Sequence, residues 1–207
     1  MKNWPFLLLA TGLVLTACKD DDEPIACEPD PEYTPGKTGS YWVYEVSSTN
    51  AQGEVTLQNY VDSIYLDEDS VINGQSYRVE RGTYFNAPYL SLLRKENQQL
   101  IAEDGAVAFT PVISNDTFST FYDASIQTNF YAQMVDPGFE WETPAGTFDV
   151  IAKRTAIITA FPVSWSNPQF QYIFWADGIG IVGDESFFFS NADTKIRRRL
   201  LRYQLVE

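Results

Sequence analysis

The chain has 207 residues, with 14 Lys and Arg against 28 Asp and Glu, and it contains no histidine. A net charge of −14 repels phosphate backbones, so the composition argues against a nucleic-acid-binding protein. Without histidine, Ser-His-Asp catalysis, Cys-His catalysis and imidazole-bound zinc are excluded. We therefore expect no metal site and no cofactor.

Residues 1–17 have the parts of a bacterial lipoprotein signal peptide. Lys2 supplies the positive charge, residues 6–15 form an apolar run too short to span a bilayer, and two small residues precede Cys18. We expect cleavage before Cys18 and acylation of Cys18, which would be the sole membrane attachment. An ordinary secretory leader is the alternative. Cleavage leaves 190 residues with a net charge of −15, because only Lys2 is lost.

Residues 18–38 are acidic and rich in proline, which is typical of an extended tether. Cys27 lies in this segment and has no intrachain partner if Cys18 is acylated, so it is either free or pairs between chains. The start of the tether resembles the Lys-then-acidic export signal of Bacteroidota lipoproteins, which implies delivery to the surface of the outer membrane. A solvated acidic linker is the alternative. The export-signal residues are Lys19, Asp20, Asp21, Asp22 and Glu23.

Residues 39–207 form one predicted domain in which strand signals dominate. Residues 41–46 and 55–65 are aromatic and β-branched and predict a hairpin, and Asn73-Gly74 predicts a tight turn into residues 77–80. Helical spacing occurs at 115–123, with an N-capping asparagine and three aromatic residues on one face. We therefore predict an all-β fold with at most one or two short helices. Further strands are expected at 88–95, 99–103, 106–110, 126–135, 147–159, 170–176, 179–182 and 195–206.

Four groups of short motifs follow one another in this domain. They are Gly39-Ser40-Tyr41-Trp42-Val43-Tyr44, Asp62-Ser63-Ile64 with Gly74-Gln75-Ser76-Tyr77, Thr143-Pro144-Ala145-Gly146-Thr147-Phe148-Asp149-Val150, and Phe174-Trp175-Ala176-Asp177-Gly178-Ile179-Gly180-Ile181-Val182. Together they resemble a large group of Bacteroidota outer-membrane lipoproteins, which is similar to the lipoprotein-carrier-like proteins. The resemblance implies a single strongly curved antiparallel sheet, a half-open barrel with a concave apolar face and no catalytic residues. Carriers proper are soluble shuttles, so a tethered chain does not inherit the shuttling role.

Aromatic residues make up 15% of the chain and provide the candidates for a ligand-lining surface. Strand alternation places Trp42 and Tyr44 on one face and places Phe174 opposite Trp175. Packing in the core is the alternative interpretation. Residues 187–189 are three consecutive phenylalanines, which predict an exposed apolar patch. The ligand-lining candidates are Trp42, Tyr44, Trp141, Phe174 and Trp175.

Charged and hydroxyl residues provide a second set of candidates. Glu140 and Glu142 flank Trp141 at strand spacing and could form a carboxylate pair, although a solvated outer row is the better interpretation. Ser63 and Ser70 lie in Asp-Ser-apolar triplets that resemble Bacteroidota O-glycosylation sites. The basic cluster in residues 195–202 predicts outward-facing arginines paired with acidic neighbours, with an anion site as the alternative. Gly178 and Gly180 predict a bulge or a sharp coil of the sheet.

These observations predict a lipid-anchored, non-enzymatic binding or scaffolding protein of the outer membrane, facing the cell surface. The expected partners are the membrane, through acylated Cys18, and a hydrophobic ligand, a glycan or an outer-membrane protein. The alternative is a surface polysaccharide hydrolase that uses carboxylates.

Overall fold

The computed structural model of the protein describes residues 31–160, 168–188 and 191–207. The predicted anchor Cys18, the export motif and Cys27 lie outside these residues, as do Trp165 and Phe189. A compact unit runs from Pro31 to Glu207, whereas the sequence predicts a domain start at residue 39. No described helix could cross a membrane.

Every regular element in the described part of the chain is a β-strand. The strands are β1 (Tyr41–Thr49), β2 (Val55–Leu66), β3 (Ser70–Ile72), β4 (Gln75–Tyr84), β5 (Ala87–Glu96), β6 (Gln99–Ala102), β7 (Val107–Phe109), β8 (Ser119–Asp123), β9 (Thr128–Val135), β10 (Glu140–Thr143), β11 (Gly146–Asp149), β12 (Ile151–Thr159), β13 (Gln169–Ala176), β14 (Gly180–Phe188) and β15 (Asn191–Gln204).

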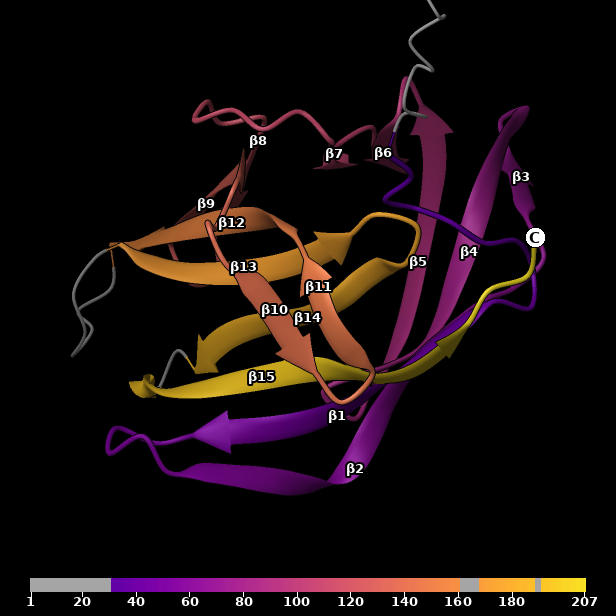
Figure 1. The fold of residues 1–207 in the computed structure, drawn as a ribbon. Coiled ribbons are helices and arrows are strands. Elements are labelled where there is room, and N and C mark those ends of the chain that lie inside the picture. The colour runs from indigo at the N-terminus through magenta and orange to yellow at the C-terminus, as the bar shows by residue number, and fades with distance from the viewer. Residues whose placement is uncertain (1–30, 161–167, 189–190) are drawn as a thin grey trace, which may run out of the picture. The chain divides into compact units, whose positions relative to one another are not determined.

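One antiparallel sheet dominates the domain and curls into a nearly closed barrel (Figure 1). Its strand order is β7-β6-β5-β4-β2-β1-β15-β14-β13-β12-β9-β8, with β3 paired to β4, and the edge strands β7 and β8 leave a seam between them. The prediction of an all-β, strongly curved antiparallel sheet is confirmed. The β1–β2 hairpin is also confirmed, with pairing from Tyr41↔Tyr65 to Thr49↔Val55.

Local turn chemistry explains several connections in this sheet. Asn73 and Gly74 have φ values of 51° and 78°, which is the left-handed pair that a tight β3–β4 hairpin requires. Gly178 lies in the turn of the β13–β14 hairpin, so the glycines terminate a strand rather than bend a continuous one. A bulge is therefore not found at the predicted glycines; the β13–β14 pair instead has a register shift between Phe174 and Trp175.

Two predicted elements differ from the structure. The predicted helix at 115–123 is wrong, because Ser119–Asp123 forms edge strand β8 and pairs with β9. Pairing with a neighbouring strand therefore overrides the helical spacing of the aromatic residues. The predicted strand at 147–159 is interrupted at Val150. Its first part, β11, pairs with β10 in a separate two-stranded sheet, and its second part, β12, belongs to the main sheet.

The β10–β11 hairpin covers the outer face of the barrel over β14 and β15 (Figure 1). At its tip, the Ala145 amide donates to the Leu200 carbonyl oxygen at 3.0 Å. Trp141 of the hairpin stacks on Phe174 with a centroid distance of 4.0 Å. Because Phe174 and Trp175 point to opposite faces of β13, Trp175 faces the interior. Trp175 and the Trp141–Phe174 stack therefore lie on opposite faces of the main sheet.

Candidate functional site

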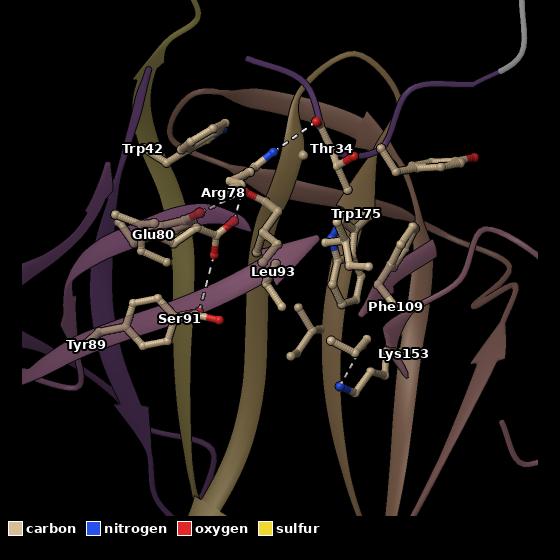
Figure 2. Close-up of a pocket in the computed structure, with 18 residues that line it drawn as sticks. Thr34, Trp42, Arg78, Glu80, Tyr89, Ser91, Leu93, Phe109, Lys153 and Trp175 are labelled. Carbon is tan, nitrogen blue, oxygen red and sulfur yellow. Dashed lines mark hydrogen bonds and ion pairs between the residues drawn. The ribbon is translucent and has the colours of Figure 1, made fainter. Parts of the chain in front are cut away.

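A cavity of about 150 Å³ lies inside the curved sheet (Figure 2). Its walls come from strands far apart in the sequence: β1, β4, β5, β12, β13 and β14 all contribute side chains. The surface is mostly apolar, with Trp42, Leu93, Phe109, Ile173 and Trp175 among the lining residues. Phe109 and Trp175 contact each other with ring centroids 4.8 Å apart. Their packing fixes one wall of the cavity.

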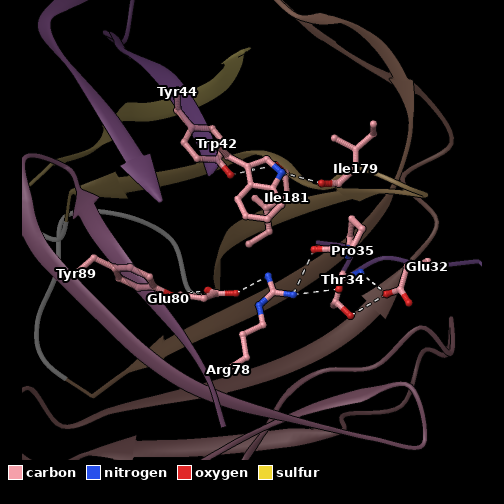
Figure 3. A network of polar contacts seen from close by, with 10 residues as sticks. All are labelled: Glu32, Thr34, Pro35, Trp42, Tyr44, Arg78, Glu80, Tyr89, Ile179 and Ile181. Atoms are coloured by element: carbon pink, nitrogen blue, oxygen red, sulfur yellow. Dashed lines mark hydrogen bonds and ion pairs between the residues drawn. The ribbon is translucent and has the colours of Figure 1, made fainter. Parts of the chain in front are cut away.

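Trp42 and Tyr44 form the opposite wall, and their polar atoms are already bonded (Figure 3). Trp42 Nε1 donates to the Ile179 carbonyl oxygen at 2.7 Å, and the Tyr44 hydroxyl donates to the Ile181 carbonyl oxygen at 3.0 Å. Burial raises the pKa of Tyr44, so the hydroxyl stays neutral. These side chains therefore present ring surface to the cavity rather than free hydrogen-bond donors.

An Arg78–Glu80 ion pair provides the polar part of the lining. Their closest atoms are 2.8 Å apart, and the Tyr89 hydroxyl donates to Glu80 Oε2 at 3.3 Å. Burial and the negative charge of Glu80 together raise the pKa of Tyr89 to about 12. Arg78 Nη1 also donates to the Thr34 carbonyl oxygen at 3.0 Å. The guanidinium therefore links strand β4 to the segment that precedes β1 (Figure 3).

That preceding segment, residues 31–38, is called here the strap. The Glu32 amide donates to Asp177 Oδ1 at 2.6 Å, and the Gly178 amide donates to the Glu32 carbonyl oxygen at 2.9 Å. On the other side, Lys95 Nζ lies 2.6 Å from Glu32 Oε2. Burial opposes ionisation of Glu32, but the hydrogen bonds from Lys95 and Thr34 and the charge of Lys95 together outweigh burial, so the pKa of Glu32 is lowered. The strap thus joins the β13–β14 turn to β5 across the cavity.

A larger surface hollow of about 630 Å³ lies beside the strap. It shares Thr34, Arg78, Leu93 and Leu100 with the interior cavity, so the two spaces meet at these residues. The C-terminal residue Glu207 also lines the hollow. The hollow therefore adjoins the interior cavity.

Lys153 of β12 is the one lysine in the cavity lining. Its Nζ donates to the Ala108 carbonyl oxygen at 3.0 Å. Burial lowers the pKa of Lys153, because desolvation disfavours the ammonium form. Among the residues that the structure describes, no carboxylate lies within ion-pair distance of this nitrogen.

A buried ionic cluster adjoins the Tyr44 wall. Arg198 is 2% exposed, and its Nε donates to Asp184 Oδ2 at 2.7 Å. Asp62 Oδ2 lies 3.9 Å from Arg198 Nη1. Asp62 also accepts the backbone amides of Phe85 and Asn86, at 2.6 and 3.0 Å, in the β4–β5 turn.

Aromatic rings and charge complement the guanidinium of Arg198. Its Cζ lies 4.0 Å from the centroid of Tyr84 and 4.8 Å from that of Tyr44. Burial raises the pKa of Asp184, although the Arg198 charge opposes the rise. Burial would lower the pKa of Arg198, but the charge and hydrogen bond of Asp184, together with Tyr84 and Tyr44, outweigh burial and raise that pKa. The cluster therefore holds an arginine cation inside the barrel.

The five aromatic candidates divide between two places. Trp42, Tyr44 and Trp175 line the cavity, whereas Trp141 and Phe174 pack under the β10–β11 hairpin. All five side chains are less than 8% exposed. Of the phenylalanine triplet, Phe187 is buried and Phe188 is exposed.

The remaining candidates lie away from the cavity. Glu140 and Glu142 are exposed on β10 on either side of buried Trp141, which is the alternation of a solvated outer row. Ser63 and Ser70 are half-buried in β2 and β3. No cluster of His, Cys, Asp and Glu in the described residues could hold a metal ion.

The basic strand follows the predicted alternation. Arg197 pairs with Glu185, and Arg199 pairs with Glu45, on the outer side of the sheet. Arg198, between them, faces inward. The prediction of outward arginines paired with acidic neighbours is confirmed. The sequence analysis missed the inward residue, although three consecutive arginines in a strand necessarily place the middle one on the opposite face.

Lys153, Arg78 and Glu80 were also missed by the sequence analysis. The sequence could have indicated Lys153, because in a strand it lies on the same face as Ile151 and Ile157, which are both buried. A charged residue on an otherwise buried strand face indicates an internal polar position.

Comparison with known proteins identifies the fold. No protein-family profile and no curated protein matches the chain. A similar solved structure is a protein of Bacteroides fragilis described as exported and as having a YmcC-like fold. Its identity is 14% and its TM-score 0.52, over 84% of this chain and 99% of that chain. Another is a protein of Parabacteroides distasonis described as a lipoprotein, with 15% identity and a TM-score of 0.52, over 86% of this chain and 100% of that chain.

The chain shares the fold of these two proteins. The predicted resemblance to Bacteroidota lipoproteins is therefore confirmed at the level of the YmcC-like fold.

Proposed function

We propose that the protein is a lipid-anchored, non-enzymatic binding protein of the outer membrane, facing the cell surface, that holds a hydrophobic chain in the barrel interior. The observation that carries this proposal is the apolar cavity of about 150 Å³, which shares four lining residues with the hollow beside the strap. Anchoring through Cys18 is supported by the signal-peptide pattern and by the descriptions of the two proteins with the same fold.

The size and lining of the cavity favour a hydrophobic ligand over a glycan. An engineered cavity of about 150 Å³ in another protein binds benzene, whereas pockets for whole small molecules are typically about 300–1,000 Å³. The interior therefore has room for a ring or for one end of a chain, and the rest of the ligand would lie in the hollow. A sugar would need hydrogen-bond donors, but Trp42 and Tyr44 already use theirs on backbone carbonyl groups.

A binding role is also better supported than polysaccharide hydrolysis. The carboxylates Glu140 and Glu142 face solvent on one short strand. Glu80, the carboxylate in the cavity lining, is held by Arg78 and Tyr89. A hydrolase needs a carboxyl group that can act as an acid and a second one across the scissile bond.

Binding of decanol tests this proposal. The chain from residue 18 carries Cys18→Ala, so that no acyl group competes, and Trp fluorescence reports on Trp42 and Trp175 in the cavity wall. We expect saturable binding that Leu93→Trp weakens at least tenfold, because the larger side chain fills the cavity. Leu90→Trp is the matched control, since Leu90 lies on the same strand but is 56% exposed. Equal affinity in both variants would place the ligand outside the cavity.

A further inference from the structure

The cavity contains one lysine side chain for which no described residue supplies a counter-charge. Arg78 is paired with Glu80, whereas the bonded acceptor of Lys153 is a neutral backbone carbonyl group. An ammonium group has three donors, and burying it without a counter-charge is unfavourable. The described part of the chain therefore supplies one of three hydrogen-bond partners and no anion.

The surroundings of Lys153 restrict what the missing anion can be. Its cross-strand neighbours are Ile173 on β13 and Met134 on β9, and Phe109 and Trp175 also line the cavity. Figure 2 shows Lys153 at the end of the cavity away from Thr34 and the strap. A single cation among apolar side chains suits a monoanion. A dianionic phosphate would need a second cation or several further donors.

We propose that the cavity binds an apolar chain that ends in a carboxylate, and that Lys153 binds the carboxylate while the chain extends toward the strap. This inference rests on the proposed function, because it names the ligand class of the same cavity. The carboxylate supplies the counter-ion, and the tail contacts Leu93, Trp42 and Trp175. Burial of Lys153 supports the assignment, because a lysine with a lowered pKa gains most from a charged partner.

Decanoate and decanol, which share a chain length and differ in charge, test the assignment on the Cys18→Ala chain. We expect the Cys18→Ala chain, with its cavity unchanged, to bind decanoate at least tenfold more tightly than decanol. Such a preference is typical of a charge-assisted hydrogen bond. Lys153→Met should remove the preference while decanol binding persists. Lys195→Met is the matched control, because Lys195 is exposed and outside the cavity lining.

A calorimetric measurement without any change at Lys153 gives a second readout. In the alkaline range below the ordinary lysine pKa of about 10.4, binding of decanoate should take up protons, because the anion raises the lowered pKa of Lys153. The uptake is obtained from binding enthalpies in buffers of different ionisation enthalpy, and Lys153→Gln should abolish it. The other titratable or charged groups that line the cavity are Tyr33, Tyr44, Arg78, Glu80 and Tyr89.

The outcomes separate this inference from the proposed function. Equal affinity for decanoate and decanol, or a preference for decanoate that survives Lys153→Met, overturns the carboxylate assignment and leaves a hydrophobic site. Tighter binding of decyl phosphate than of decanoate overturns it too. Failure of every probe to bind rejects the proposed function itself.

Discussion

Replacement of Arg198 by methionine tests whether the buried ionic cluster stabilises the barrel. Arg198, Asp184 and Asp62 are each at most 2% exposed. In Arg198→Met, Asp62 keeps its two backbone donors, but Asp184 loses the guanidinium that binds its carboxylate. Removal of one member of a buried ion pair costs about 3–5 kcal/mol. We therefore expect the free energy of unfolding to fall by about that amount at neutral pH.

The loss should depend on pH in a defined direction. Burial already raises the pKa of Asp184, and loss of the Arg198 charge raises it further. A carboxyl group whose folded pKa lies above its unfolded value of about 3.9 destabilises the fold as pH rises through that interval. The cost of Arg198→Met should therefore be larger at about pH 7 than at about pH 5, because a proton on Asp184 of the folded variant removes the unpaired charge.

Urea unfolding followed by Trp fluorescence at these two pH values measures the effect. Arg199→Met is the control, because Arg199 pairs with Glu45 on the outer face and should contribute less than about 1 kcal/mol. The double variant Arg198→Met, Asp184→Leu should recover most of the stability, since it leaves no unpaired Asp184 charge. A pH-independent loss, or one no larger than that of Arg199→Met, would refute this account.

Further predictions concern backbone geometry, titration and anchoring. Gly82→Ala should cost more than about 3 kcal/mol, because an added Cβ would lie 1.7 Å from the Ser63 carbonyl oxygen, whereas Gly74→Ala, with open space around it, should cost about 1 kcal/mol in the same urea assay. Tyr89 should resist ionisation until about pH 12, while the unfolded residue titrates near pH 10, so its contribution to stability is lost between these values; tyrosinate absorbance of wild type and Tyr89→Phe measures this. Cys18→Ala should abolish palmitate labelling and membrane partition, and cleaved protein that stays on membranes without label contradicts the anchor. Alanine at residues 20–22 should retain labelling but reduce protease shaving of intact cells, whereas unchanged shaving leaves the segment as a linker.

The sequence predicted those parts of the fold that depend on local chemistry. Asn73-Gly74 marks its hairpin because both residues tolerate positive φ. The β4–β5 turn lacks such a signal. Phe85 and Asn86 occupy the same left-handed region, at φ values of 50° and 60°, but phenylalanine is not a residue that marks such a turn. Their conformation is supported by the Asp62 carboxylate, which comes from β2. A contact between residues more than 20 positions apart cannot be deduced from the turn itself.

The candidate site was predicted only in part, because its residues also depend on how distant strands are arranged. Aromatic content identified Trp42, Tyr44 and Trp175 as lining residues, but it equally selected Trp141 and Phe174, which face the other side of the sheet. Alternation gives relative faces within one strand and does not tell which face of the sheet becomes the interior. The helix predicted at 115–123 is wrong, because Phe121 and Tyr122, expected to share one face of a helix, are exposed on an edge strand.

The position of the strap has a mechanical consequence. Residues 31–38 continue directly into the segment that leads back to Cys18, so a pull on a membrane anchor would act first on the contacts that join Glu32 to Asp177, Gly178 and Lys95. Fully extended, the 14 residue steps from Cys18 to Glu32 reach at most about 50 Å. If Cys18 is the anchor, Glu32 of the strap would therefore stay within that distance of the bilayer. Tension on the anchor would therefore act on the strap contacts before it acts on the strands of the barrel.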